Sequence, residues 1–548
     1  MKKNFTSIFL AILISLLVQV SVVATEQSKD NIKVQLNNDK VIFNEKVGFP
    51  FLDGNNRVQT PFRVILEMFG AKVTWNENEK MAIAQKGDII VKVPIGKKYI
   101  YRNSDVIIND TNSMLINGRT YLPIRAVMES FGCDVNWSEK EKVIYISNTN
   151  NDTTINKIPS KYDLRKFNKL TPVKDQKEIG ACWAFATLGS IESVLMPSKA
   201  FDLSEDHLSL GHGYNVSQNK GGDFNIAMSY LARWDGPVLE VDDPYGDGKM
   251  NATAKVVKHV QEAKVLPSKD YSAIKLSLLL YGGVQSAMYF DESLTKGNNT
   301  IYNNETYSFY YKGNAKFNHA VVIVGWDDNY PKGNFSTQPE ANGAFICKNS
   351  YGKDFGDDGY FYVSYFDKHI GTENVVYSRV DNISNYSRIY QTDYLGWVGR
   401  LGYGTDSAYF ANAYDIKDKK ENLRAVSFYA TDKNTKYEVY VVKKFKTTSD
   451  FKNMTLVKKG SLDYEGYYTI DFDSPILIEN KFAVVVKITT AGSSLPVAAE
   501  YYKKVDWLDK VIISDGEGYM SQHGTSWDST ENIFDSNVCL KAFTSTIE

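Results

Sequence analysis

The amino-acid sequence predicts a multidomain protein in which two α+β regions precede an all-β region. Three observations predict this fold class. The stretch from Arg57 to Trp75 recurs 62 positions later (119 − 57), as Arg119 to Trp137. Apolar residues at helical spacing follow Cys182, and the later half of the same region contains runs typical of strands. Beyond residue 381, short strand-like runs alternate with polar turns, which is typical of a β-sandwich.

Composition and the first residues indicate the class of protein and its location. The chain has 548 residues, 43% of them apolar, and a net charge of −2, so it has the composition of globular domains and no basic excess for nucleic acid. Two lysines precede an apolar stretch from Ile8 to Val23, which predicts a signal peptide over residues 1–24. A membrane-spanning helix is the weaker alternative, because the run is short and interrupted by polar residues. We expect a secreted or cell-surface bacterial protein without a transmembrane anchor.

Residues 25–147 are predicted to form one domain that contains both copies of the repeat. Each copy has a proline at the start of a short amphipathic helix, a glycine at its end and then two strand-like runs. Cys133 stands in the place of Ala71 and is expected to be a small buried core residue. The repeat resembles the domain named after the N-terminal region of copper amine oxidases, which implies a stalk or surface-association module. We expect no copper site, because all six histidines lie at or after His207.

Residues 148–157 are polar and predict a linker to the next domain. Because this segment lies between two modules, our hypothesis is that it is cleaved during maturation, which releases a fragment that begins near Ile158. N-terminal sequencing of secreted protein tests this hypothesis, and a single start at Thr25 would contradict it.

Cys182 is the candidate nucleophile of the region that follows. Gly180 permits a tight turn before it, and the apolar periodicity predicts a helix that starts at the cysteine. The positive end of the helix dipole favours the thiolate over the thiol, and a free thiol is mostly unreactive at neutral pH. Taken alone, the segment favours a buried structural cysteine, which is the commoner situation for this residue type.

Two later segments contain the partners that a thiol nucleophile needs. His319 stands at the head of a β-branched, strand-like run, and Asn349 follows Cys347 and Lys348. A nucleophilic cysteine needs a base, and the base needs a hydrogen-bond acceptor that orients it. Cysteine, histidine and asparagine occur in this chain order.

This arrangement resembles the papain-like cysteine peptidases over residues 158–380. Gln176 stands six residues before Cys182, where that family has a glutamine that helps to form the oxyanion hole. His319 follows Cys182 by 137 residues (319 − 182), within the expected range of about 130–150, and Asn349 follows it by 167 (349 − 182), somewhat beyond that range. Other matching segments are Ile158–Arg165, Thr171–Gln176, Leu203–Glu205, Gly221–Gly222 and Pro244–Tyr245. The resemblance implies a helical half and a β-barrel half, and catalysis by Cys182, His319, Asn349 and Gln176 without metal or cofactor.

The resemblance also implies which residues bind the substrate. These are Gly180, Gly221, Gly222, Phe224, Phe317 and Tyr351. Phe224 and Phe317 map onto the family's specificity pocket, which would suit apolar or aromatic side chains, and core packing of both rings is an equal alternative. Two positions depart from the family's pattern. Ile179 replaces a cysteine that is usually disulfide-bonded, and Tyr351 replaces a tryptophan, so we expect the tyrosine ring to cover the asparagine–histidine bond.

Residues 381–548 are predicted to form an all-β sandwich. The expected strands are Ala425–Ala430, Tyr437–Val442, Tyr467–Phe472, Phe482–Thr489 and Val538–Phe543. The region resembles the lectin-like domain that follows papain-like domains in some clostridial cell-surface peptidases, which implies a carbohydrate partner. Its aromatic residues are more often core residues when they lie in strands. Asp393, Asp406 and Asp415 are candidate ligands for a structural calcium ion, but solvated turn carboxylates are the favoured interpretation, since no EF-hand loop is present.

Together these observations predict a secreted papain-like cysteine endopeptidase that cleaves protein or peptide substrates through a thioester acyl-enzyme. A transglutaminase also needs a thiol and a histidine, but it usually has an aspartate as the third residue. A cell-surface adhesin with an inactive peptidase domain usually lacks the cysteine or the histidine, and both are present here. The four cysteines are widely scattered, so we predict no disulfide bonds.

Overall fold

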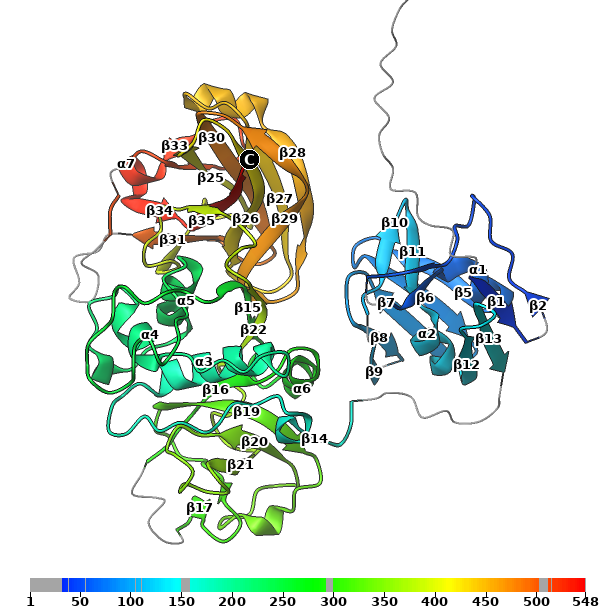
Figure 1. Cartoon of the computed structure of the whole chain (residues 1–548), viewed down its shortest axis with the longest axis horizontal. Coiled ribbons are helices and arrows are strands. Elements are labelled where there is room, and N and C mark those ends of the chain that lie inside the picture. The colour runs from blue at the N-terminus through cyan, green and yellow to red at the C-terminus, as the bar shows by residue number, and fades with distance from the viewer. Residues whose placement is uncertain are drawn as a thin grey trace, which may run out of the picture. The chain divides into compact units, whose positions relative to one another are not determined.

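The computed structural model describes residues 32–148, 158–291, 299–501 and 511–547, apart from the single residues 38, 55, 104, 110 and 514. The chain divides into two compact units, residues 1–158 and 159–548 (Figure 1). The predicted signal peptide lies outside the described residues, as does nearly all of the predicted linker. Within the described ranges, no helix is both long enough and apolar enough to cross a membrane. All four cysteines are described, and none forms a disulfide bond.

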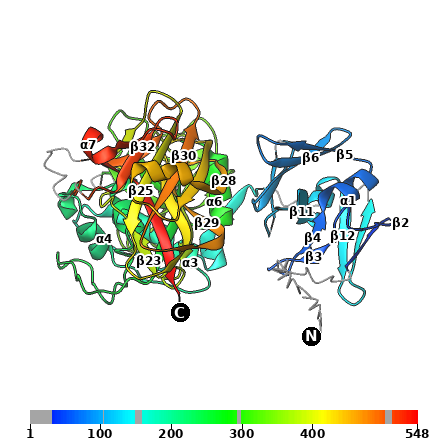
Figure 2. The same cartoon turned by 90° about the horizontal axis from the view of Figure 1, so that it is seen from above.

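The first unit consists of three sheets and two short helices. The strand orders are β12-β13-β1-β2, β10-β11-β4-β3 and β5-β6-β7-β8-β9, so β5 and β6 belong to a different sheet from β3 and β4 (Figure 2). The elements are β1 (Lys33–Leu36), β2 (Asp39–Lys40), β3 (Phe51–Leu52), β4 (Val58–Pro61), α1 (Phe62–Met68), β5 (Lys72–Asn76), β6 (Met81–Lys86), β7 (Ile89–Pro94), β8 (Tyr99–Arg102), β9 (Asp105–Ile108), β10 (Met114–Ile116), β11 (Arg119–Pro123), α2 (Ile124–Ser130), β12 (Cys133–Ser138) and β13 (Val143–Asn148).

Each repeat contains the predicted helix followed by two strands. The helices begin one residue after Pro61 and Pro123, so each proline ends a strand and stands at the N-cap of the helix. Gly70, just past the end of α1, has a φ of 84°, a left-handed conformation that glycine adopts without strain. Cys133 and Ala71 are both buried in the core of this unit, which confirms the prediction for Cys133.

An approximate two-fold axis relates the two repeats. β4 and β11 are equivalent strands and pair antiparallel, with Pro61 opposite Tyr121 and Pro123 opposite Gln59. Tyr121 is the repeat partner of Gln59, and Pro123 is that of Pro61, since both pairs are 62 residues apart. Exchanging the two copies therefore reproduces the same register, as a two-fold axis between the strands requires.

In the second unit, one long sheet joins the two regions that the sequence analysis treats as separate domains. Its order is β17-β18-β21-β20-β19-β16-β22-β15-β29-β26-β35-β23, and β14 pairs with β19 beside this path. β15 (His259–Leu266) pairs with β22 (Asn374–Asp381) on one side and with β29 (Glu465–Ile478) on the other. The sheet of residues 158–380 therefore continues without a break into residues 381–548 (Figure 1).

The helices of this unit are α3 (Cys182–Leu195), α4 (Glu205–Gly211), α5 (Phe224–Ala232), α6 (Tyr271–Leu280) and α7 (Thr530–Phe534). The remaining strands up to residue 380 are β14 (Lys161–Asp163), β16 (Val284–Met288), β17 (Tyr302–Asn303), β18 (Ser308–Phe309), β19 (His319–Asp327), β20 (Ala344–Lys348) and β21 (Tyr360–Ser364). Short 3-10 helices span Leu164–Phe167, Gln218–Lys220, Lys332–Asn334 and Thr448–Asn453. A core cluster joins α3, α4 and α5 to Tyr429 and Tyr467 of the C-terminal region.

The C-terminal region adds a six-stranded sheet with the order β28-β27-β30-β25-β32-β33. Besides β29, the strands described in the whole C-terminal region are β23 (Arg388–Tyr390), β24 (Gly399–Leu401), β25 (Ser407–Asp415), β26 (Glu421–Ala430), β27 (Thr435–Val442), β28 (Thr455–Leu462), β30 (Lys481–Thr490), β31 (Val497–Tyr501), β32 (Gly518–Ser521), β33 (Asp528–Ser529), β34 (Ser536–Val538) and β35 (Leu540–Thr546). One apolar cluster contains side chains from both sheets, among them Phe428 and Val486. The run predicted as one strand, Val538–Phe543, is divided at Cys539 between β34 and β35, which belong to different sheets.

The structure confirms one further expectation for this region, that aromatic residues in its strands are core residues, and contradicts another. Phe410 and Tyr414 in β25 are buried core residues, so neither can stack on a sugar. Asp393 is not a solvated turn carboxylate, because it is fully buried and accepts a hydrogen bond of 2.7 Å from Lys541 Nζ. A buried lysine neutralises this carboxylate, which leaves it poorly suited to bind calcium.

Candidate active site

Cys182 is the first residue of α3 and lines a cleft of about 860 Å³. The chain reaches it through Gly180, whose N–H donates to Asn219 Oδ1 at 3.1 Å. A Cβ at Gly180 would lie 2.7 Å from the carbonyl oxygen of Asn219, so only glycine fits this approach. The helix start and the turn before it agree with the predicted local structure. The backbone N–H of Cys182 belongs to the first turn of α3, where N–H groups have no partner within the helix.

His319 is the first residue of β19, and its imidazole is held by Asn349, which follows the last residue of β20. The distance from His319 Nε2 to Asn349 Oδ1 is 2.8 Å. The backbone N–H of Ser350 also donates to Oδ1, at 2.9 Å, which fixes the orientation of the amide. Nε2 must therefore donate its hydrogen, and the neutral imidazole keeps a lone pair on Nδ1.

Burial controls the charge of both groups. It raises the pKa of the Cys182 thiol, although backbone N–H groups, including that of Ala320, oppose this shift. It also lowers the pKa of His319 to about 4, opposed by the hydrogen bond with Asn349. The upward shift for the thiol is opposite to the prediction from the helix dipole, because loss of solvation outweighs the dipole and the backbone donors.

Gln176 is held in the cleft by five hydrogen bonds, one of them from the backbone N–H of Ile179 to the Gln176 carbonyl oxygen at 3.3 Å. Its Oε1 accepts from Ser350 Oγ at 2.6 Å, and its Nε2 donates to the carbonyl oxygen of Ile179 at 2.9 Å. Its backbone N–H donates to Ser350 O at 2.8 Å, and its carbonyl oxygen accepts from Tyr245 Oη at 2.9 Å. Nε2 has two hydrogens, so one of them remains for a group in the cleft. The side chain is only 6% exposed and is fixed before any substrate arrives.

Two aromatic rings enclose the imidazole. The ring of Tyr351 stacks on that of His319, with centroids 5.0 Å apart and an angle of 20°, and the Tyr351 hydroxyl lies 3.5 Å from Nδ1. Phe290 lies 5.3 Å from both rings and is buried. The sequence analysis did not identify Phe290, which stands two residues after the end of β16 and has no local motif. These rings contribute to the burial of the imidazole, and burial lowers the pKa of His319.

Comparison with known proteins identifies three regions in this chain. The model of the papain family cysteine protease matches residues 158–380. This region is similar to the papain family of cysteine proteases. The model of the copper amine oxidase N-terminal domain matches residues 35–146, and that of the lectin-like domain matches residues 389–544. The order of the three domains is the order that the sequence analysis predicts.

Relatives of the papain-family domain include viral and animal cathepsins. A viral cathepsin of Heliothis zea nuclear polyhedrosis virus is 28% identical over 214 residues, which are 38% of this chain and 53% of the relative. Pro-cathepsin H of Mus musculus is 30% identical over 215 residues, 37% of this chain and 60% of the relative. The chain thus spans between about half and two thirds of the length of these curated relatives.

Two solved structures resemble the papain-family and lectin-like domains together. The clostridial cysteine protease Cwp84 after propeptide cleavage is 28% identical, has a TM-score of 0.62, and the match covers 71% of this chain and 100% of that chain. A crystal structure of the cysteine protease and lectin-like domains of Cwp84, a surface layer associated protein of Clostridium difficile, gives a TM-score of 0.61 at 28% identity, over 71% of this chain and 89% of that chain.

The structure places all the implied substrate-binding residues of the papain-family domain along one cleft. A Cβ at Gly222 would lie 2.5 Å from the indole of Trp183, so glycine alone lets this loop segment of the cleft pack on α3. Phe224 is half-buried, and Phe317 is 48% exposed. The exposure of Phe317 argues against core packing for this ring and leaves it available to a substrate.

Three carboxylates that line the cleft, Asp223, Glu373 and Glu465, have no counterpart in the sequence analysis. Glu373 precedes β22, and Glu465 is the first residue of β29 in the C-terminal region. Burial raises the pKa of Glu373, and Asp223 raises it further. Burial raises the pKa of Glu465 to about 7, although Arg400 opposes the shift. No motif indicates Glu465, because it reaches the cleft only through the pairing of β29 with β15.

Proposed function

We propose that the protein is a secreted cysteine endopeptidase whose catalytic residues are Cys182, His319, Asn349 and Gln176. The observation that supports this function best is the hydrogen bond from His319 Nε2 to Asn349 Oδ1, which leaves Nδ1 as a base in the cleft that Cys182 lines. The papain family of residues 158–380 and the cathepsins among its relatives support the same reaction.

In the proposed acylation step, Cys182 Sγ attacks the carbonyl carbon of the scissile peptide bond while His319 Nδ1 accepts the thiol proton. Neither charge is stable alone at this buried site, but an adjacent thiolate and imidazolium stabilise each other as they form. Gln176 Nε2–H and the Cys182 backbone N–H donate to the oxyanion. The imidazolium then gives its proton to the leaving amine as the C–N bond breaks, which leaves a thioester on Cys182.

Hydrolysis of the thioester completes the proposed cycle. His319 Nδ1 removes a proton from a water molecule, whose oxygen attacks the thioester carbonyl, and the same oxyanion donors act again. The C–S bond breaks, the thiol regains the proton, and the carboxylic acid product leaves. Asn349 Oδ1 accepts from Nε2–H throughout, so Nδ1 is the nitrogen that gains and loses the proton. The proposed residues act without a metal or a cofactor.

We extend the proposal to location and substrate class. The predicted signal peptide and the resemblance to a surface layer associated clostridial protease favour a secreted or cell-surface enzyme that acts on proteins or peptides. The lectin-like region favours a carbohydrate partner for residues 381–548.

The test of the function is a peptide-hydrolysis assay combined with labelling by an epoxide that alkylates papain-like thiols. We expect hydrolysis by the wild-type protein, none by Cys182→Ala, and loss of activity in proportion to labelling of Cys182, mapped by mass spectrometry. Cys347→Ala is the matched control, because this thiol is fully buried in β20 and the variant should keep its activity. Epoxide labelling of another cysteine with loss of activity would contradict the assignment.

A further inference from the structure

The first unit contains two grooves that are copies of each other. The α2 groove, of about 500 Å³, lies beside α2 and includes Trp137, and the α1 groove, of about 560 Å³, lies beside α1 and includes Trp75. Of the fifteen residues that line the α2 groove, thirteen have their repeat partner, 62 positions away, in the lining of the α1 groove. The two-fold axis between β4 and β11 therefore generates two equivalent sites.

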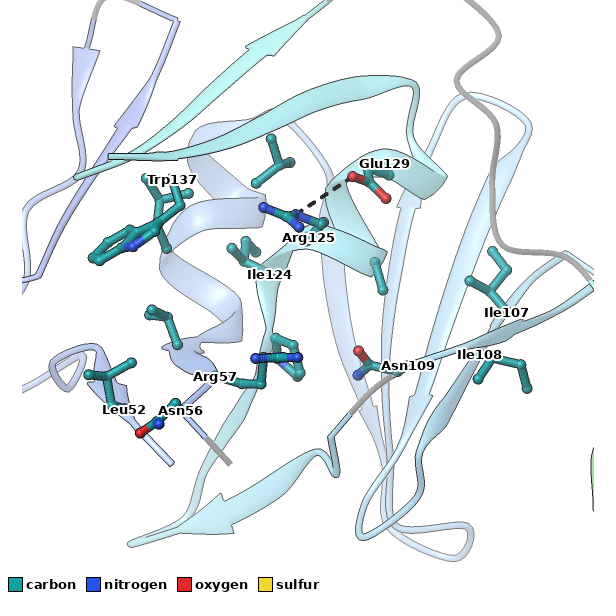
Figure 3. Close-up of a pocket in the computed structure, with 15 residues that line it drawn as sticks. Leu52, Asn56, Arg57, Ile107, Ile108, Asn109, Ile124, Arg125, Glu129 and Trp137 are labelled. Atoms are coloured by element: carbon teal, nitrogen blue, oxygen red, sulfur yellow. Dashed lines mark ion pairs between the residues drawn. The ribbon is translucent and has the colours of Figure 1, made fainter. Parts of the chain in front are cut away.

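Each groove requires both repeats. The α2 groove combines Arg125, Glu129 and Trp137 of the second copy with Arg57 of the first (Figure 3). The α1 groove combines the equivalent residues of the first copy with Arg119 of the second. A single repeat would thus form neither groove, and the duplication produces two at once.

The residues that stay identical between the repeats are mainly those in the grooves. Eight positions from Arg57 to Trp75 have the same residue 62 positions later, and six of these eight line the grooves. Fully buried core positions have changed instead, since Ile65 corresponds to Val127 and Leu66 to Met128. Core substitutions usually affect stability more than surface substitutions do. Stability alone therefore does not explain why the exposed groove residues are the same in both copies.

The exposed side chains of each groove form the same polar and aromatic set. Arg125 pairs with Glu129 at 3.8 Å in the α2 groove, and Arg63 pairs with Glu67 at 3.1 Å in the α1 groove. Both arginine side chains are 60% exposed, so exposed ion pairs of this kind hold them weakly and leave them accessible to a ligand. Trp137 is 37% exposed at the side of its groove. An accessible indole beside a guanidinium offers an apolar face and a donor for an anionic group.

The charge of the grooves favours an anionic ligand. The α2 groove is lined by two arginines and one glutamate, and the α1 groove by two arginines, two lysines and two glutamates, so basic groups exceed acidic ones in both. A single molecule that fills both equivalent sites must present the same chemical group at least twice. A polysaccharide built of acidic sugars does so, because each ring has an apolar face for the indole and a carboxylate for the arginine.

We propose that the two grooves bind a linear acidic polysaccharide at two equivalent sites on one chain. Two sites on one polymer raise its affinity roughly 10²-fold or more over that of a fragment that fills one site. This proposal concerns residues 32–148 and does not depend on the peptidase activity.

The test is calorimetric titration of the full-length protein with galacturonate oligomers. A trimer serves as the probe for single sites and a chain of about 20 units as the probe for both. We expect two trimers per chain, binding that weakens as salt is added, and a longer chain that binds roughly 10²-fold more tightly than the trimer. Arg63→Gln and Arg125→Gln should each remove one trimer site and most of the gain for the long chain, and the double variant should abolish both.

Lys72→Gln is the control variant, because Lys72 is an exposed cation of the same unit that lines neither groove. It should bind both oligomers within two-fold of the wild type, and thermal unfolding should show that all variants fold. Failure of the trimer to bind, equal effects of Lys72→Gln and Arg125→Gln, or a single trimer site would overturn the two-site proposal. Equal affinity for neutral dextran oligomers or for poly-glutamate would overturn the assignment of an acidic polysaccharide.

Discussion

Replacing Gln176 by alanine separates the proposed oxyanion donor from the proposed nucleophile and base. Gln176 Nε2 has one hydrogen bonded to Ile179 O and a second free for the cleft, and Ser350 Oγ fixes the other end of the amide. Removing one fixed oxyanion donor costs about 3–4 kcal/mol of transition-state stabilisation, or roughly 10²–10³ in kcat. Because the donor acts mainly in the transition state, we expect KM to change little.

The assay compares two reactions of the same thiol. Peptide hydrolysis develops an oxyanion, whereas alkylation of Cys182 by iodoacetamide does not, although both need the thiol to lose its proton. Gln176→Ala should therefore reduce kcat for hydrolysis by roughly 10²–10³ and leave the alkylation rate within about three-fold of the wild type. His319→Ala should slow both reactions.

Equal losses in both reactions of Gln176→Ala would refute this reasoning. Such a result would mean that Gln176 acts through the position of Cys182, for instance through its contacts with the loop before α3, and not on the oxyanion. Ser350→Ala is an intermediate case, since it removes the 2.6 Å bond that orients Gln176 but leaves Nε2 in place. We expect it to lose less kcat than Gln176→Ala.

Three further predictions concern the junction between the two regions of the second unit. Glu465→Gln should lower kcat/KM about five-fold for a peptide whose lysine reaches the part of the cleft beside Glu465, and it should leave kcat/KM for the norleucine analogue of that peptide unchanged. Because the pKa of Glu465 is about 7, the wild-type preference for lysine should grow as pH rises through 7. Equal effects of the substitution on both peptides would contradict this prediction. His259 stacks on Trp234 at 3.8 Å, and burial lowers the pKa of His259 to about 4, so the unfolded chain takes up the proton first and stability falls between pH 6.5 and 4. His259→Phe should remove about 2 kcal/mol of the loss measured by urea unfolding between pH 7 and 4.5, and an unchanged pH dependence would exclude this. A chain that ends at Asp381 lacks β29 and leaves the edge of β15 unpaired, so it should aggregate in size-exclusion chromatography, and a folded, active monomer would show that the two regions are independent.

Much of the catalytic site could be predicted because its parts are local in the sequence. The helix that begins at Cys182 and the strand that begins at His319 are visible as periodicity, and the structure has both elements at those residues. Asn349 could be placed only through the family resemblance, since nothing in its own segment indicates which side chain it meets. The sign of the pKa shift at Cys182 could not be predicted, because it depends on burial by segments distant in the chain.

Features that depend on non-local pairing were missed for the same reason. The buried pair of Asp393 and Lys541 joins residues far apart in the chain, so Asp393 looked like a turn carboxylate. Within the repeats the sequence indicates the shared residues, but it does not show that each groove combines side chains from both copies. That depends on the antiparallel register of β4 and β11, which no single strand pattern specifies.

The pairing of β15 with β29 explains how the C-terminal region contributes to the substrate cleft. Gly466 lies opposite Lys264, and a Cβ at Gly466 would lie only 2.1 Å from the carbonyl oxygen of Ala263, so glycine is required for this approach. The preceding residue, Glu465, is therefore held beside the cleft by main-chain hydrogen bonds and not by a flexible loop. Because a carboxylate on a paired strand is preorganised, it can discriminate between substrates without the cost of ordering a loop. We therefore expect the C-terminal region to take part in substrate selection, and we expect a change at Gly466 to alter the cleft from a distance.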